Sequence, residues 1–291
     1  MENATAKMSC FARAYHCRYS PCPVFQDTAA EPLLGTEFAQ IAQTLSAGAH
    51  FFLPGFSGTS QAGLRRIVDG QLAPPVLARS ALCESALAQA AAAGCRQYVL
   101  FAAGYDTFAI RRQDPALTVF ELDLPELLRD KRQRIAQASL HSGAVYVSCD
   151  LSSGLWPEAL TAHGYDPGAR SFGSILGLSY YLREADLRAL LTAAASTMSV
   201  GSLLCLDYPT GGNSHHAAIT RALAEAAGEQ MQASYAPQEM RALLASCGFA
   251  ILEELTAEEM TQRFFAAHNR TAPDLPMAAP EGVQYLLAVR K

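Results

Sequence analysis

A small-residue turn followed by a carboxylate is the feature of this chain best suited to chemistry. The apolar run 98–102 leads into a turn around Ala103 and Gly104, and a second apolar run, 118–122, leads to Asp123. A turn of small residues lets the backbone approach a ligand, and a carboxylate about 20 residues later can accept both hydroxyls of a ribose. The segment therefore predicts a nucleotide-type cofactor at the tips of two neighbouring strands.

The glycine pattern of this turn discriminates between cofactors. A dinucleotide fold has G-x-G-x-x-G after its first strand, whereas this turn has one glycine, Gly104, followed by the large Tyr105. A pyrophosphate cradle, and with it a nicotinamide dehydrogenase, is disfavoured. S-adenosylmethionine carries no phosphate and needs fewer glycines. Ala102 stands where the first glycine would be, a small change if it keeps a negative φ.

Strand-like and helix-like runs alternate through most of the chain, which predicts an α/β fold with a mostly parallel sheet. Ligands of such sheets bind outside the carboxyl ends of the strands. The seven predicted strands are six parallel ones and an antiparallel C-terminal one, 283–289. The other six cover 98–102, 118–122, 145–149, 171–178, 203–208 and 249–255, and the predicted helices cover 37–45, 78–94, 106–111, 125–139, 156–163, 184–199, 215–227 and 237–247.

We expect one domain over residues 1–291, with a cap or lid over 1–80 and an α/β cofactor-binding core over 81–291. The segment 11–16 is too apolar for a tail and is expected to fold over the cofactor, with Arg13 as a second contact. The Gly- and Phe-rich stretch 48–63 is expected to form a loop, either the mobile part that admits the acceptor or a surface connection.

Composition narrows the function further. The 291 residues are half apolar, and the net charge of −5 without a basic run argues against nucleic acid as a partner. The N-terminus lacks a charged start followed by an apolar stretch, and no apolar run reaches 18 residues. The eight cysteines show no C-x-x-C pair and no His cluster, so no metal site is predicted. These features favour a cytoplasmic protein, a monomer or homodimer, without membrane contact.

Several sequence blocks resemble the leucine carboxyl methyltransferase family. The blocks AAGYDTFAIR and FELDLPELLRDKR are similar to its Gly-Ala-Gly-x-Asp-Thr turn and Glu-x-Asp-x-Pro motif. FARAYHCRYSPCPVFQDTAAEPLL, LARSALCES, VSCDLSSGLWPEALTAHGYDPGARSF and LGLSYYL are similar to further blocks, in the same order. The resemblance covers nearly the whole chain. It implies a Rossmann-like class I methyltransferase that uses S-adenosylmethionine, in a group whose bacterial members resemble polyketide O-methyltransferases.

The resemblance also implies roles for individual residues. Arg79 would hold the cofactor's carboxylate in a fork, and Ala103 and Gly104 would contact its methionine part through their backbone. Asp123 would accept the ribose hydroxyls, with Glu121 facing the other side of the strand. The remaining contacts implied are Leu124 beside Asp123, Asp150 and Leu151 around the adenine, and the turn of Leu176 and Gly177. Many members of the family carry Glu at the position of Leu176, so a methionine-end contact is missing here.

The candidates for a catalytic role are His16, Tyr180, Tyr181 and Tyr208, because each is expected on the lid or at a strand end. A carboxylate acceptor needs no base, whereas a hydroxyl or amine acceptor needs a proton sink. Tyrosine faces also favour a sulfonium. Packing is the alternative role for these residues. His215 and His216 are expected to cap or precede a helix, with a place in the acceptor site as their alternative role.

The sequence therefore predicts methyl transfer to a small-molecule acceptor, most simply O-methylation of a carboxylate or hydroxyl in secondary metabolism. Two alternatives stay open at this point. One is methylation of a protein's C-terminal carboxyl group, which the family name implies. The other is a cofactor-binding homologue without transfer activity, which Leu176 keeps open.

Overall fold

A seven-stranded mixed sheet forms the centre of the molecule, in the strand order β3-β2-β1-β4-β5-β7-β6. The computed structural model describes residues 3–211, 222, 225, 228, 230, 231 and 233–291. Six strands are parallel, and β7 is antiparallel to both of its neighbours, β5 and β6. The predicted fold is confirmed. The strands are β1 (Gln97–Phe101), β2 (Thr118–Asp123), β3 (Ala144–Ser148), β4 (Ser171–Ile175), β5 (Leu203–Pro209), β6 (Phe249–Leu255) and β7 (Val283–Arg290).

The central strand β1 shows why helices cover both faces of the sheet. All five of its residues are buried, and successive side chains point to opposite faces. Tyr98 and Leu100 join one hydrophobic core, whereas Val99 and Phe101 join the other. Helix α6 (Ala73–Ala92) packs in the first core. The second core contains α9 (Trp156–Ala162), α10 (Glu184–Thr197) and α12 (Pro237–Ser246).

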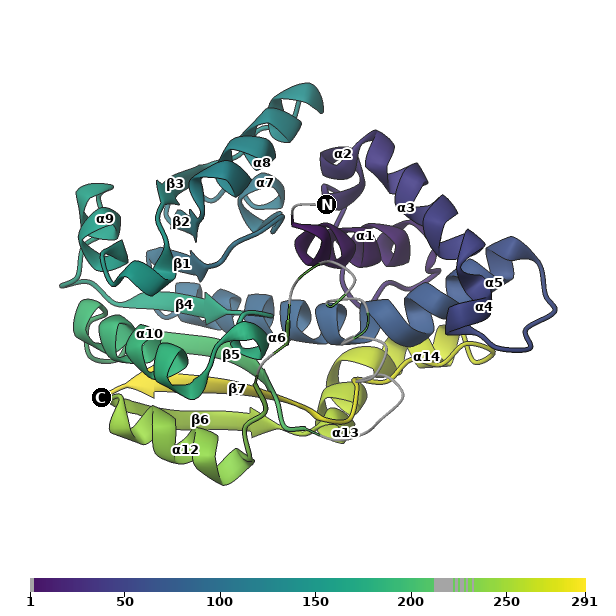
Figure 1. Cartoon of the computed structure of the whole chain (residues 1–291). Helices are drawn as coiled ribbons and strands as arrows, with labels where there is room; N and C mark the ends of the chain where they lie inside the picture. Colours follow the sequence, from purple (N-terminus) through teal and green to yellow (C-terminus); the bar gives the residue numbers. More distant parts are fainter. Residues whose placement is uncertain (1–2, 212–221, 223–224, 226–227, 229, 232) are drawn as a thin grey trace.

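The N-terminal helices form a cap beyond the carboxyl ends of the parallel strands (Figure 1). The stretch predicted as a loop over 48–63 is a loop at its centre, 53–59, and helical at 49–52 and from residue 60 on, where Thr59 caps a helix that buries Leu64 and Ile67. A π-helical turn, Val68–Leu72, then joins this helix to α6. The cap helices are α1 (Ala4–Tyr19), α2 (Ala30–Leu34), α3 (Thr36–Ala47), α4 (Ala49–Phe52) and α5 (Ser60–Ile67).

Shorter elements complete the fold. A further segment that the sequence left unassigned, 257–271, forms α13 (Ala257–Met260), a π-helical turn (Thr261–Phe265) and α14 (Ala266–Thr271). The helices that follow β1 and β2 are α7 (Phe108–Arg111) and α8 (Pro125–Gln137). The predicted helix 215–227, with His215 and His216, lies outside the described residues. In the described part of the chain, no helix is long and apolar enough to cross a bilayer. Helix α6 runs across residue 80, where the sequence analysis divided the cap from the core. That boundary therefore stays a prediction.

Candidate functional site

A cavity of about 600 Å³ opens at the carboxyl ends of β1, β2, β4 and β5. The strand order reverses between β1 and β4, which is the switch point where ligands of α/β sheets bind. The segments that follow these strands form one wall, with residues 101–106, Asp123, Leu124, 176–178 and Pro209. Helix α1 and the start of α6 form the opposite wall. The volume falls within the range typical of small-molecule sites.

Asp123 joins the tips of β1 and β2 at the floor of the cavity. Its Oδ2 accepts the backbone N–H of Gly104 at 2.8 Å, and its Oδ1 accepts the N–H of Leu124 at 2.8 Å. Burial raises the pKa of this carboxyl group, while the two N–H donors oppose the shift. Each carboxylate oxygen has a second lone pair, so Asp123 can still accept hydrogen bonds from a ligand.

Glu121, two residues earlier on β2, is fully buried and is not among the residues that line the cavity. Lys131 of α8 donates to its Oε2 at 2.6 Å. Burial raises the pKa of Glu121 to about 7, although the Lys131 ammonium group lowers it. Side chains two residues apart on a strand point to the same face of the sheet, so Glu121 lies on the same face as Asp123, and the expectation that it faces the other side is wrong.

The turn after β1 is more strained than the sequence suggests. Ala102 has a φ of 54°, so the expectation of a negative φ is wrong. The Ala102 backbone turns back here so that Ala103 can donate its N–H to the carbonyl of Leu122 at 3.1 Å. Gly104 also has a positive φ of 52°, and a Cβ there would stand 3.4 Å from Ala6 of α1. The turn therefore lies directly under the cap.

Arg79 reaches into the cavity from α6 between two strand ends. Its guanidinium lies 3.4 Å from Asp207 Oδ2 and donates to Ser9 Oγ of α1 at 3.4 Å. Both contacts are long, which leaves its other N–H groups available for a ligand. Gly177 leaves room for it, since a Cβ on that residue would stand 2.6–2.8 Å from the guanidinium.

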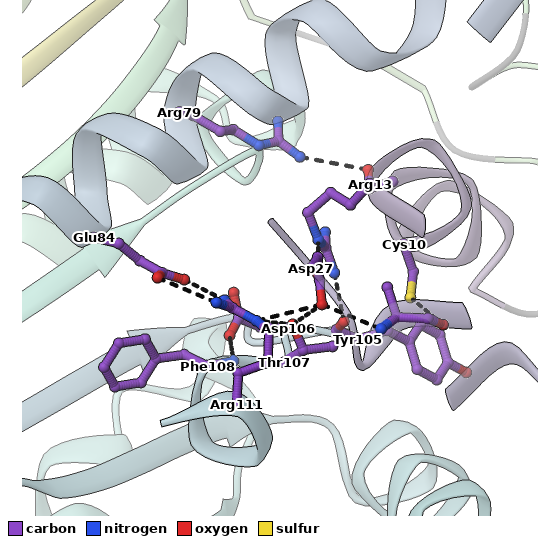
Figure 2. A network of polar contacts seen from close by, with 12 residues as sticks. Cys10, Arg13, Asp27, Arg79, Glu84, Tyr105, Asp106, Thr107, Phe108 and Arg111 are labelled. Atoms are coloured by element: carbon purple, nitrogen blue, oxygen red, sulfur yellow. Dashed lines mark hydrogen bonds and ion pairs between the residues drawn. The ribbon is translucent and has the colours of Figure 1, made fainter. Parts of the chain in front are cut away.

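A buried polar network braces the cap against the turn after β1 (Figure 2). Arg13 of α1 donates to Asp27 Oδ2 at 2.7 Å and to the carbonyl of Tyr105 at 2.7 Å. Asp27 also accepts the hydroxyl of Thr107 at 2.6 Å and forms an ion pair with Arg111 at 3.3 Å. The positive charges of Arg13 and Arg111 hold the pKa of Asp27 below its usual value, although burial raises it. Arg13 also lines the cavity, although its hydrogen bonds to Asp27 and to the carbonyl of Tyr105 stay within the protein.

Nine of the residues singled out from the sequence line this one cavity. They are Arg79, Ala103, Gly104, Asp123, Leu124, Leu176, Gly177, Tyr180 and Tyr181. Asp150 and Leu151 are not among its lining residues. Asp150 is exposed, and its carboxylate accepts the N–H of Ser152 at 2.8 Å to cap the turn after β3. The predicted role of these two residues toward an adenine stays a prediction.

Two of the catalytic candidates lie elsewhere. His16 is fully buried beneath the cap, where its Nδ1 meets Asp69 Oδ1 at 2.8 Å and its Nε2 accepts the N–H of Val24 at 3.1 Å. With both ring nitrogens engaged, His16 serves the packing of the cap. Tyr208 points to the other face of the sheet and donates to Glu254 Oε1 at 2.8 Å. Neither lines the cavity, so the sequence-based assignment of both to a proton-transfer site is corrected.

Three lining or supporting groups were missed from the sequence. Asp207 is fully buried in β5, and an Asp within the apolar run LLCLDY was a signal for it. Asp106 follows the turn after β1 and lines the cavity. Gln71 lies in the π-helical turn, for which no sequence signal exists. Its Nε2 donates to the carbonyl of Phe52 at 2.9 Å, while its Oε1 is buried without a hydrogen-bond partner.

Neither metal nor disulfide chemistry is indicated by the described residues. The eight cysteines are free thiols. Among the residues that the structure places, no three His, Cys, Asp or Glu side chains gather as a metal site would require.

The sequence is similar to proteins named as S-adenosyl-L-methionine-dependent methyltransferases. A model of the leucine carboxyl methyltransferase family matches residues 6–195. YktD of Bacillus subtilis (strain 168), which bears that name, is 30% identical over 302 residues, covering 99% of this chain and 97% of YktD. A protein of Mycobacteroides abscessus with the same name is 34% identical over 210 residues, covering 71% of this chain and 67% of that protein.

The architecture is also similar to solved structures. A methyltransferase structure from Thermobifida fusca YX superposes with a TM-score of 0.56 at 15% identity, covering 96% of this chain and 94% of that one. At this level of identity the likeness concerns the fold.

Proposed function

The chain belongs to the leucine carboxyl methyltransferase family and is an S-adenosylmethionine-dependent methyltransferase, and we propose that it methylates an oxygen of a small molecule held in this cavity. The single observation that carries the proposal is the cavity itself, which is lined by Asp123, the Gly104 turn and Arg79 together.

The residues around the cavity fit the cofactor. Asp123 would accept the ribose hydroxyls, and the backbone of Ala103 and Gly104 would approach the methionine part. Arg79 would pair with the carboxylate through its remaining N–H groups. Leu124, which is 41% exposed at the rim, would offer an apolar contact to the adenine. When bound, S-adenosylmethionine supplies a methyl group activated by its sulfonium.

The protein's own part in such a transfer is alignment and the exclusion of water. Helix α1 lies across the turn after β1, as the 3.4 Å approach of Ala6 to the Gly104 position indicates. The Arg13–Asp27 network locks α1 to that turn. The cap would therefore cover the cofactor's end of the cavity and exclude water from it.

Gln71 is a polar residue of the cavity wall, next to the start of α6. The N–H group that faces the Phe52 carbonyl fixes the orientation of the amide, so the unpartnered atom is the oxygen Oε1. That oxygen has almost no accessible surface, so a substrate in the cavity would not contact it without a movement of the amide. The neighbours of Gln71 in the cavity wall, Leu72, Pro75 and Val76, are apolar. An acceptor with an apolar body fits these surroundings.

A hydroxyl acceptor has to lose a proton during transfer. Tyr180 is poorly suited to take it, because its hydroxyl donates to Asp207 at 2.9 Å and its pKa is raised well above the usual value by burial and by that carboxyl. Tyr181 and the carboxylates of Asp106 and Glu281 also line the cavity. We propose that one of these three side chains accepts the proton.

The remaining expectations carry over as parts of the proposal. A net charge of −5 favours a small-molecule partner over nucleic acid, and eight free cysteines suit a cytoplasmic setting. The proposal also includes that the protein is a monomer or homodimer and that it acts in secondary metabolism. Methylation of a protein's C-terminal carboxyl group is the competing outcome.

The test is methyl transfer from S-adenosylmethionine with a labelled methyl group. The enzyme is incubated with a panel of phenols, alcohols and small carboxylic acids, and separately with peptides that end in a free leucine carboxylate. Products are then treated with mild base, which releases methanol from methyl esters and leaves methyl ethers intact. Base-stable label in a small molecule is the expected result. Label confined to the peptides would contradict the proposal.

A further inference from the structure

The carboxyl group of Asp207 contacts three groups of the cavity wall at once. Its Oδ1 accepts the N–H of Gly177 at 2.7 Å. Its Oδ2 accepts the hydroxyl of Tyr180 at 2.9 Å and lies 3.4 Å from the Arg79 guanidinium. The contacts join three elements, because Asp207 belongs to β5, Gly177 and Tyr180 follow β4, and Arg79 lies on α6.

The backbone of Asp207 adds a fourth contact to the same loop. Its carbonyl accepts the hydroxyl of Ser179 at 2.7 Å. The loop after β4 is thus attached to one residue of the adjacent strand at three points along four residues. Such attachment fixes the left-handed conformation of Gly177, whose φ is 69°.

Gly177 and Asp207 together confine the Arg79 side chain. A Cβ on Gly177 would stand within 2.8 Å of the guanidinium, so the side chain lies directly against the turn. Asp207 is itself fully buried and is not among the cavity-lining residues. A ligand would therefore touch Arg79, Gly177 and Tyr180 but not Asp207.

A fully buried carboxyl group persists in a fold only with strong partners. Here the partners are the cavity-wall groups nearest the proposed methionine end. Leu176, by contrast, is an apolar residue at a position where the resemblance to the family implies a glutamate. In this chain, the carboxyl group near the proposed methionine end is therefore that of Asp207. It lies on β5, next to β4, and does not line the cavity.

We propose that Asp207 is a positioning residue for the amino-acid end of the cofactor. It holds Arg79 at the angle at which the guanidinium meets the cofactor's carboxylate, and it fixes the Gly177 turn against which that group lies. The inference rests on the proposed placement of S-adenosylmethionine in the cavity.

The experiment compares two ligands by calorimetry. S-adenosylhomocysteine has the amino-acid end, whereas 5′-methylthioadenosine has the same nucleoside and thioether without it. Asp207→Asn removes the negative charge and keeps the side chain's size. We expect the variant to bind S-adenosylhomocysteine with about tenfold lower affinity, which corresponds to the loss of one charge-assisted contact. Its affinity for 5′-methylthioadenosine should stay within about twofold of the wild-type value.

If Asp207 had only a structural role, the substitution would change the affinity for both ligands to the same extent. Equal weakening of the two, or no weakening of either, would overturn the inference. A wild-type protein that binds S-adenosylhomocysteine no more tightly than 5′-methylthioadenosine would instead contradict the placement of the carboxylate at Arg79. Asp186→Asn, the same change at the exposed ion pair with Arg183, is the matched control and should leave the affinity for both ligands unchanged.

A second measurement covers the case in which Asp207→Asn does not fold. Arg79→Met leaves the buried carboxyl group without its countercharge, and the double variant Arg79→Met/Asp207→Asn removes both charges. If the pair is coupled, the double variant melts at a higher temperature than Arg79→Met alone. A double variant that melts at the same or a lower temperature would overturn the coupling.

Discussion

The Oδ2 oxygen of Asp123 accepts the backbone N–H of Gly104 at 2.8 Å, across the tips of two neighbouring strands. One residue ends β2, and the other lies in the turn after β1. The contact holds the proposed ribose acceptor and the proposed methionine-contacting backbone at a fixed separation. The two halves of the proposed cofactor site are therefore joined by a hydrogen bond within the protein itself.

Ala102→Gly should stabilise the protein. Ala102 has a φ of 54°, a left-handed conformation that is unfavourable for L-residues by about 1–2 kcal/mol. The greater freedom of glycine in the unfolded chain offsets roughly 0.5–1 kcal/mol of that gain. The free energy of unfolding should rise by about 0.5–1 kcal/mol, measured by urea denaturation. Ala103→Gly is the control and should destabilise, because Ala103 is not among the positive-φ residues. Equal losses in both variants would show that the turn is not strained.

Asp27→Asn should destabilise the cap strongly. The change leaves Arg13 and Arg111 as buried cations without their shared carboxylate. Removal of one partner from a buried ion pair lowers the free energy of unfolding by about 3–5 kcal/mol. Asp186→Asn, at an exposed ion pair with Arg183, is the matched control and should leave the melting temperature nearly unchanged. A loss at Asp27 no larger than in the control would mean that the network does not stabilise the cap.

The same residue fixes a pH dependence of stability. The folded pKa of Asp27 lies below its usual value, so the folded state binds its proton less readily than the unfolded chain. The stabilisation is present above the usual aspartate pKa of about 3.9 and is lost as the pH falls through the folded value. Thermal melts between pH 3 and pH 6 should show a steeper acid decline in the wild type than in Asp27→Asn. Parallel declines would contradict the assignment.

Cofactor affinity should fall on acidification. The pKa of Asp123 is raised, so its carboxylate gains a proton at a higher pH than an ordinary aspartate, whose pKa is about 3.9. A protonated Asp123 has lost acceptor capacity toward ribose hydroxyls. Calorimetry with S-adenosylhomocysteine from pH 8 to pH 4 measures the decline. Asp123→Asn should lack this component, and the titration of the ligand itself is common to both proteins. Identical pH profiles would remove Asp123 from the ribose site.

The α/β core was predictable from the sequence, because buried strands and amphipathic helices each leave a local pattern. The strand 98–102 and the helix after Pro125 were placed to within a residue or two. The family and the cofactor class are confirmed by the match over residues 6–195 and by the similarity to YktD. The helices of the cap were harder to predict from the sequence. Short helices such as α4 and α5 depend on contacts with each other rather than on a long repeating pattern.

Individual side chains depended on partners that are distant in sequence. His16 looked like a base, yet Asp69 and Val24 occupy both of its ring nitrogens. Asp207 became visible as a partner of Gly177 only once β5 was known to lie beside β4. The residues of these two pairings lie 53 and 30 positions apart in the sequence. No local pattern encodes them.

The most direct measurement is calorimetric titration of S-adenosylmethionine into the wild type and Asp123→Ala. The account predicts binding to the wild type that weakens by about 1–3 kcal/mol in the variant, roughly a 5- to 150-fold loss of affinity, because a charged hydrogen bond to the ribose is removed. An Asp123→Ala protein that folds and binds with unchanged affinity would place the cofactor elsewhere and contradict the account.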